Sequence, residues 1–222
     1  MFTIKGYAKS VIGGREGNQD SFLIWPERNL FAVADGVGGG LKGDVASQMS
    51  VAGLKALHEK SVELRPVFEA IQNSVLEESI RTLGDALMGS TLTAALVDGD
   101  KLYVCHVGDS RCYLWRGGNI NCLTTDHEIF DDNIGGPVLA SYMGLPPEVH
   151  ALTIQEESEI LQAGDRLLLC SDGLYKQITE DRLMDVIHSL RIEPEKLVDV
   201  LVNEASQVNH SDNVTMIWVT ID

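Results

Sequence analysis

The order of strand-like and helix-like segments limits the folds open to this chain more than any other feature of the sequence. Apolar, β-branched segments come first, two helical patterns follow, strands return, two further helical patterns come next, and a strand closes the chain. Because the helices come in pairs and not between single strands, this order disfavours a doubly wound parallel sheet. It favours an α+β fold in which antiparallel sheet layers are covered by helices.

The helical patterns rest on apolar residues at helical spacing. Val45, Met49, Ala52 and Ala56 are separated by four, three and four positions, so they share one face of a helix. Three later segments repeat this spacing, with apolar positions at Val67, Phe68, Ile71, Val75, Ile80 and Leu83, at Leu183, Val186, Ile187 and Leu190, and at Leu197, Val200, Leu201, Ala205 and Val208.

The strand-like segments are rich in β-branched and aromatic residues and are separated by glycine-containing turns. Asp98-Gly99-Asp100, Gly108-Asp109 and Gly117-Gly118 are typical of hairpin turns. From Asp126 to His150 the chain is rich in Gly, Pro, Asp and Asn, and we expect a long loop there. The expected strands cover residues 2–8, 21–25, 29–35, 90–97, 101–107, 111–116, 119–125, 166–172 and 213–221.

Length and charge narrow the class of protein further. A chain of 222 residues is expected to form one domain over residues 1–222. Acidic residues outnumber basic ones by 33 to 17, which gives a formal net charge of −16. This balance argues against nucleic acid or an anionic membrane as the main partner. A solvated acidic surface explains it most simply, and cation binding is compatible with it.

Nothing in the sequence predicts a membrane segment or a secretion signal. No apolar run approaches the roughly 20 residues that span a bilayer, and the N-terminal segment lacks the apolar region of a signal peptide. The four cysteines, Cys105, Cys112, Cys122 and Cys170, show no CxxC spacing. We therefore expect buried, reduced thiols in a cytoplasmic protein, and, without any oligomer signal, a monomer.

The feature with chemical meaning is an aspartate beside a glycine at the end of an apolar segment, and a fourth aspartate, beside an asparagine, stands just before the last strand. A strand end fixes the direction of its side chain, and glycine lets the backbone turn and leaves its carbonyl accessible. Several carboxylates that converge at one sheet edge repel one another unless a cation lies between them, and Mg²⁺ and Mn²⁺ prefer such oxygen ligands. Taken singly, each of these aspartates could also be an ordinary turn residue. The sites are Asp35-Gly36, Gly108-Asp109, Asp172-Gly173 and Asp212-Asn213.

Seven short motifs follow one another along nearly the whole chain. They are Arg15-Glu16-Gly17-Asn18-Gln19-Asp20, Asp35-Gly36-Val37-Gly38-Gly39-Gly40 with Gly43 and Ala46-Ser47 after it, Gly89-Ser90-Thr91, Val107-Gly108-Asp109-Ser110-Arg111, Leu123-Thr124-Thr125-Asp126-His127, Ser171-Asp172-Gly173-Leu174 and Ser211-Asp212-Asn213-Val214-Thr215. In this order they resemble the metal-dependent protein phosphatases (PPM, or type 2C), in their small bacterial form.

The resemblance implies a four-layer α-β-β-α sandwich, in which two antiparallel sheets are flanked by helix pairs. It also implies a centre of two Mn²⁺ or Mg²⁺ ions at one end of the sandwich. Asp35 would bridge the two ions and the Gly36 carbonyl would hold one of them, whereas Asp172 and Asp212 would hold the other. The ions would activate a water that hydrolyses phosphoserine or phosphothreonine in proteins, which reverses the action of Ser/Thr kinases.

Three further residues receive roles from the resemblance alone. Asp20 would act mainly through metal-bound water, and Asp109 would belong to a third, weaker metal site. Arg15 would bind the substrate phosphate, and it would neutralise the charge that develops during catalysis. His127 is expected to make a structural polar contact, and the scattered histidines disfavour a zinc site.

Two departures from the family pattern affect the expected chemistry. Family members often carry a histidine shortly after the Asp-Gly pair, whereas this chain has Val37 and Gly40 at those places. A histidine general acid is therefore absent there. The Asp126–His150 region, where bacterial relatives place a flap over the substrate, is short and atypical, which leaves the substrate preference open.

Two alternatives to a protein phosphatase remain at this level. The missing histidine motivates a catalytically silent, phosphoprotein-binding regulatory module on the same fold. The second alternative is a phosphomonoesterase that acts on small molecules. The complete set of aspartates favours the protein phosphatase over the silent module.

Overall fold

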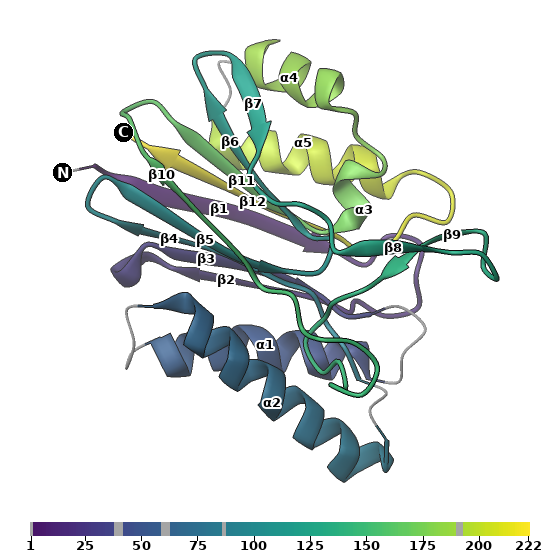
Figure 1. Cartoon of the computed structure of the whole chain (residues 1–222). Helices are drawn as coiled ribbons and strands as arrows, with labels where there is room; N and C mark the ends of the chain where they lie inside the picture. Colours follow the sequence, from purple (N-terminus) through teal and green to yellow (C-terminus); the bar gives the residue numbers. More distant parts are fainter. Residues whose placement is uncertain (1, 38–41, 59–62, 86–87, 190–192) are drawn as a thin grey trace.

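The computed structural model describes residues 2–37, 42–58, 63–85, 88–189 and 193–222. Two five-stranded antiparallel sheets lie face to face, and a pair of helices covers the outer face of each (Figure 1). The result is the α+β, four-layer sandwich that the element order and the family resemblance predicted. The fold class is therefore confirmed.

The first sheet contains both the N-terminal and the C-terminal strand of the chain. Its order is β1 (Ile4–Val11), β12 (Val214–Ile221), β11 (Arg166–Cys170), β6 (Arg111–Arg116) and β7 (Asn119–Cys122). All four neighbouring pairs in this sheet are antiparallel.

The second sheet is built from the middle part of the chain. Its order is β10 (Gln155–Ile160), β5 (Lys101–Val107), β4 (Leu92–Asp98), β3 (Leu30–Asp35) and β2 (Asp20–Trp25), again antiparallel throughout. A separate two-stranded ribbon, β8 (Glu128–Asp131) and β9 (Gly136–Leu139), projects from one end of the sandwich (Figure 1).

The helices are distributed between the two outer faces. α1 (Gly43–His58) and α2 (Leu64–Leu83) cover the second sheet, and α4 (Glu180–Ser189) and α5 (Pro194–Ser206) cover the first (Figure 1). The short α3 (Asp172–Tyr175) lies at the end from which the ribbon projects, and the 3₁₀ helix η1 (Pro26–Arg28) joins β2 to β3. None of the helices in the described part of the chain combines the length and hydrophobicity needed to span a bilayer.

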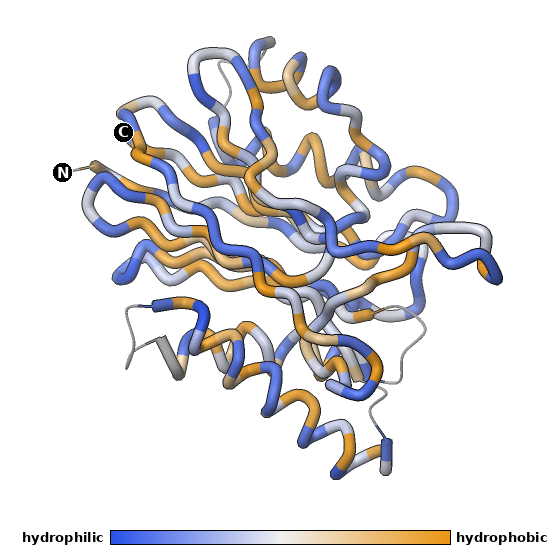
Figure 2. Tube along the Cα trace, in the orientation of Figure 1, coloured by the Kyte–Doolittle hydropathy of each residue, from blue (hydrophilic) through white to orange (hydrophobic). Residues whose placement is uncertain are grey.

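Three hydrophobic layers hold these elements together, one between the sheets and one beneath each helix pair. Figure 2 shows apolar residues running along the strands of both sheets. The layer between the sheets contains Phe31 of β3, which is 1% exposed. A Cβ atom at Gly6 would lie 2.6 Å from the Phe31 ring, so the two sheets approach closely where β1 passes over β3.

Most of the predicted elements are confirmed, but two expectations about the middle of the chain were wrong and one strand was missed. Gly108-Asp109 is not a hairpin turn, because β5 belongs to the second sheet and β6 to the first, so the turn crosses between sheets. The loop expected over residues 126–150 contains the β8–β9 ribbon. The edge strand β10 was missed because its sequence, Gln-Glu-Glu-Ser-Glu-Ile, is rich in residues that are rare in strands. The predicted helix position Leu190 lies outside the described residues.

The prediction of buried thiols is confirmed for three of the four cysteines, whereas Cys122 is only partly buried. All four cysteines fall within the described residues and none forms a disulfide there. Cys105, Cys112 and Cys170 are buried, and burial raises the pKa of Cys105 to about 12. These thiols therefore act as small hydrophobic side chains of the core.

We expect Phe31→Ala to lower the free energy of unfolding by about 3–5 kcal/mol, because it leaves a cavity between two sheets that cannot close together. Phe22 of the neighbouring β2 is 41% exposed and serves as the control, and Phe22→Ala should cost about 1 kcal/mol or less. Urea denaturation of both variants measures the difference. Equal losses would contradict the assignment of Phe31 to the layer between the sheets.

Candidate active site

Four aspartates that are distant in the sequence meet at the end of the sandwich from which the ribbon projects. A cavity of about 70 Å³ is lined there by Gln19, Asp35, Gly36, Val37, Thr91, Asp109, Leu139, Asp172 and Asp212. Five of these are predicted site residues: Asp35, Gly36, Asp109, Asp172 and Asp212. The structure thus brings together the residues that the strand-end pattern singled out.

Strand geometry explains why these side chains converge. Asp35 is the last residue of β3, Asp172 lies two residues after β11, and Asp212 lies two residues before β12. Asp109 lies in the turn that crosses from β5 in one sheet to β6 in the other. Each carboxylate therefore comes from a backbone segment that is fixed by a buried strand.

Two glycines allow the backbones around the cavity to approach one another. A Cβ atom at Gly36 would clash with the carbonyl group of Gly43, at the start of α1. A Cβ atom at Gly173 would clash with the carbonyl oxygen of Asn213. The second contact sets the Asp172 segment against the Asp212 segment, so glycine is required there by packing.

Asp20 lies behind the cavity. It is 9% exposed and directly opposite Asp35 in the pairing of β2 with β3. The Ser171 hydroxyl donates a 2.7 Å hydrogen bond to Asp20 Oδ2, whereas Oδ1 is buried and has no hydrogen-bond partner among the described residues. Burial, with a smaller contribution from the charge of Asp172, raises the pKa of Asp20 to about 6.

Burial and neighbouring charges also disfavour the charged forms of Asp35 and Asp109. Burial raises the pKa of Asp35 well above its usual range, and the charges of Asp20, Asp172, Asp109 and Asp212 act in the same direction. Burial and the charge of Asp172 raise the pKa of Asp109 to about 7. The site is therefore an electrostatically unfavourable cluster that positive charge stabilises.

Lys176 supplies one such charge and was missed by the sequence analysis. Its Nζ atom donates a 2.7 Å hydrogen bond to Asp172 Oδ2 and lies 3.8 Å from Asp109 Oδ2. The other oxygen of Asp172, Oδ1, is buried and has no hydrogen-bond partner in the described part of the chain. The available signal was the spacing, because residues four apart share one side of a helical turn.

Arg15 supplies the second positive charge. Its Nε atom donates a 2.8 Å hydrogen bond to Asp212 Oδ1, and Nη2 donates to Oδ2, which makes a bidentate ion pair. The Arg15 side chain is 53% exposed and does not line the cavity itself. Arg15 thus lies at the rim of the cavity. Its role in binding the substrate phosphate stays a prediction.

Asn213 is a second residue that the sequence analysis did not assign to a role. Its Oδ1 atom accepts a hydrogen bond from the Gln19 backbone, and its Nδ2 atom donates to the carbonyls of Ile12 and Gly17. These three bonds of 2.8–2.9 Å fix the segment that carries Arg15. Asn213 is therefore a positioning residue for the rim.

The remaining predictions around the cavity have mixed outcomes. Val37 lies on the cavity wall, and Gly40 falls outside the described residues. His127 makes the expected structural contact, because its Nδ1 atom accepts a 3.1 Å hydrogen bond from the Gly108 backbone. It thereby supports the turn that carries Asp109.

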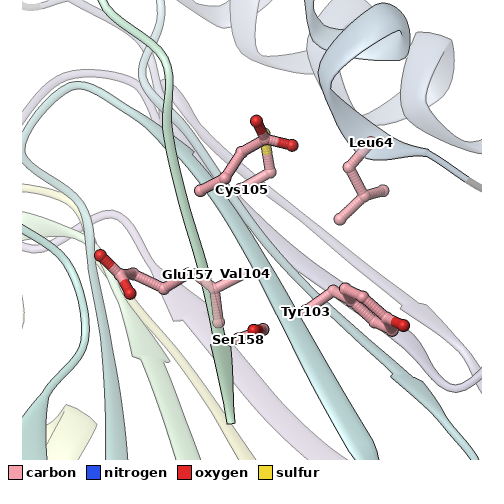
Figure 3. A pocket seen from close by; sticks show the side chains of 7 residues that line it. Leu64, Tyr103, Val104, Cys105, Glu157 and Ser158 are labelled. Atoms are coloured by element: carbon pink, nitrogen blue, oxygen red, sulfur yellow. The ribbon is translucent and has the colours of Figure 1, made fainter.

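Cavity size does not distinguish this site from other hollows. A larger hollow of about 400 Å³ lies along β5 and β10 and is lined by Leu64, Tyr103, Val104, Cys105, Glu156, Glu157 and Ser158 (Figure 3). None of the converging aspartates lines it. The chemistry of the lining, and not its volume, marks the acidic cavity.

The residues of the acidic cavity fit hard divalent cations. The donors are carboxylates and a backbone carbonyl, without a histidine or cysteine ligand, and this oxygen set suits Mg²⁺ and Mn²⁺. Among the described residues, no three His, Cys, Asp or Glu side chains form a preassembled cage around one point. Two buried carboxylate oxygens, Asp20 Oδ1 and Asp172 Oδ1, are nevertheless left without partners there, which a bound cation would satisfy.

The four-layer sandwich with an acidic, oxygen-lined cavity at one end defines the class of metal-dependent protein phosphatases. A sequence model of the family described as protein phosphatase 2C matches residues 9–200. The chain belongs to this family.

Curated relatives and solved structures agree with this assignment. The chain is 29% identical to the serine/threonine phosphatase stp of Listeria welshimeri, over 92% of this chain and 90% of that protein. It is 32% identical to the serine/threonine protein phosphatase PstP of Mycobacterium tuberculosis, over 91% of this chain and 42% of that protein. The crystal structure of the PstP catalytic domain in complex with two manganese ions has a TM-score of 0.83 and 27% identity, and the match covers 100% of this chain and 99% of that one.

Charge repulsion at the cavity makes a prediction about stability. In the presence of EDTA we expect Asp35→Asn to raise the free energy of unfolding by about 0.5–2 kcal/mol, because it removes one charge from the cluster. Asp100→Asn, in an exposed hairpin turn, is the matched control and should change little. Thermal unfolding checks both. A variant Asp35→Asn that is less stable than the wild type in EDTA would contradict the repulsion.

Proposed function

We propose that this chain hydrolyses phosphoserine and phosphothreonine in proteins in a reaction that depends on divalent metal ions. Residues 1–222 would act as a single phosphatase domain. The observation that carries the proposal is the convergence of Asp35, Asp109, Asp172 and Asp212 on one cavity in a member of the protein phosphatase 2C family. The names of the relatives, which are serine/threonine phosphatases, support the choice of substrate.

Two ions, Mn²⁺ or Mg²⁺, would be held by the residues that line the cavity. Asp35 would bridge them, with the Gly36 carbonyl on one ion and Asp172 and Asp212 on the other, and Asp20 would act through water. The unpartnered Oδ1 atoms of Asp20 and Asp172 support this assignment. The two manganese ions of the PstP catalytic domain support the number. A third ion at Asp109 would have to compete with Lys176.

When bound, two such ions lower the pKa of a shared water and neutralise charge on the phosphoryl oxygens. The chain's own residues then orient the substrate. Arg15 would bind two phosphate oxygens with its planar guanidinium group, and the bonds of Asn213 keep its segment at the cavity rim. Val37 cannot donate a proton, so protonation of the leaving oxygen falls to water or to another group at the rim.

The β8–β9 ribbon is the element best placed to contact the protein part of the substrate. Leu139 at the end of β9 lines the acidic cavity, so the ribbon adjoins the reaction centre. Its exposed apolar residues are Ile129, Phe130 and Ile134, which are 57%, 67% and 70% exposed. We propose that they contact side chains next to the phosphorylated residue of the substrate.

The unpaired, buried cysteines support a reducing and hence cytoplasmic environment for this enzyme. We propose that it acts there as a monomer on proteins phosphorylated by a Ser/Thr kinase. The net charge of −16 argues against nucleic acid or an anionic membrane as its main partner.

We expect Asp35→Asn and Asp172→Asn each to lower kcat on a phosphothreonine peptide by roughly 10²-fold or more with Mn²⁺ present, because each removes charge and a ligand oxygen from the reaction centre. Asp100→Asn should keep wild-type turnover. Phosphate release from the peptide measures the effect, and hydrolysis of p-nitrophenyl phosphate with and without EDTA tests the dependence on metal. Undiminished turnover in both active-site variants would refute the metal assignment.

The same assays separate the alternatives. Product release from neither substrate, with or without Mn²⁺, would favour a silent binding module. Hydrolysis of p-nitrophenyl phosphate and small esters without hydrolysis of phosphopeptides would favour a small-molecule phosphatase.

A further inference from the structure

Lys176 places a permanent positive charge between two of the carboxylates at the cavity. We infer that this ammonium group takes the place of a third metal ion, so that the chain binds two ions where the family resemblance implies a third at Asp109. This inference rests on the proposed metal-dependent function, and it assigns Lys176 and Asp109 as positioning residues.

The position of Lys176 is fixed by the backbone of α3. The helix begins at Asp172, and the Lys176 backbone N–H donates a 3.0 Å hydrogen bond to the Asp172 carbonyl. The side chains of residues 172 and 176 therefore lie on the same side of one helical turn. Nζ reaches Asp172 Oδ2 at 2.7 Å and Asp109 Oδ2 at 3.8 Å.

Burial shows that Lys176 covers these carboxylates from the solvent side. The Lys176 side chain is 48% exposed, whereas the side chains of Asp172 and Asp109 are 18% and 9% exposed. Asp109 comes from the turn between the two sheets and Asp172 from the start of α3, so the ammonium group joins two separate elements. A buried pair of like charges needs such a cation, and here the chain supplies it.

A third divalent ion does not fit beside this group. An ion bound between Asp109 and Asp172 would lie next to the ammonium group, which is 2.7 Å from Asp172 Oδ2 and 3.8 Å from Asp109 Oδ2, and two positive centres there repel each other. The arrangement also divides the two oxygens of Asp172 between different tasks. Oδ2 pairs with Lys176, whereas Oδ1 is buried, has no hydrogen-bond partner among the described residues, and is left for the proposed pair of ions.

The number of bound ions tests the inference directly. Metal-free protein is dialysed against millimolar Mn²⁺, and bound manganese is measured per chain by elemental analysis. Wild-type protein should bind two ions. Lys176→Met should bind a third, weaker one, because Asp109 and Asp172 lose their cation, and Lys176→Gln should do the same. Lys9→Met, which removes a lysine whose Nζ lies 2.6 Å from Asp199 on another part of the surface, is the control and should bind two.

Asp109→Asn tests whether Asp109 positions Lys176 or binds a third ion. If Asp109 positions Lys176, Asp109→Asn still binds two ions, and the double variant with Lys176→Met returns from three to two. Three ions in the wild type, falling to two in Asp109→Asn, would overturn the inference and leave the phosphatase function intact. Two ions in both Lys176 variants would also overturn it. No manganese in the wild type, together with no metal-dependent turnover, would overturn the proposed function and this inference together.

Discussion

Repulsion between carboxylates that the fold forces together is the constraint on which the rest of this site depends. Burial raises the cost of ionising Asp20, Asp35 and Asp109, and the charge of Asp172 adds to it in each case. Positive charge offsets this cost, and the chain provides two cationic groups at the rim, Arg15 and Lys176. The cavity therefore attracts cations, whichever metal is bound. Its acidic lining thus has a function, unlike a solvated acidic surface elsewhere on this chain.

Holding an unfavourable cluster in place requires stability from elsewhere in the molecule. The three hydrophobic layers supply it, because each aspartate of the cavity follows or precedes a strand whose residues are almost all buried, such as β3 and β12. The backbones approach closely at Gly36 and Gly173, so the carboxylates are held as rigidly as the buried strands. The middle parts of the strands thus provide stability, and the strand ends carry the functional residues.

The sequence predicted the parts of this structure that local patterns control. Buried strands and amphipathic helices have clear periodicities, and an aspartate at the end of an apolar strand has a defined position once the sheets form. The crossing at Gly108-Asp109 could not be foreseen, because the sheet that β6 joins is decided by tertiary packing. The role of Asn213 could not be foreseen either, because its side-chain partners Ile12 and Gly17 lie about two hundred positions away in the sequence. The β8–β9 ribbon was missed because its short strands contain no buried residue and carry a weak alternation.

The same division explains why family motifs predict the centre of the cavity better than its rim. Motif residues such as Asp35 and Gly36 are fixed by the backbone of the fold, so their arrangement follows wherever the fold forms. Rim residues such as Lys176 act through long side chains, and they can differ between members without any change in the strands. If the ammonium of Lys176 replaces an ion, the number of metals in such a phosphatase depends on one residue outside the motifs. Metal content then has to be inferred from which side chain reaches Asp109, and not from the presence of Asp109 itself.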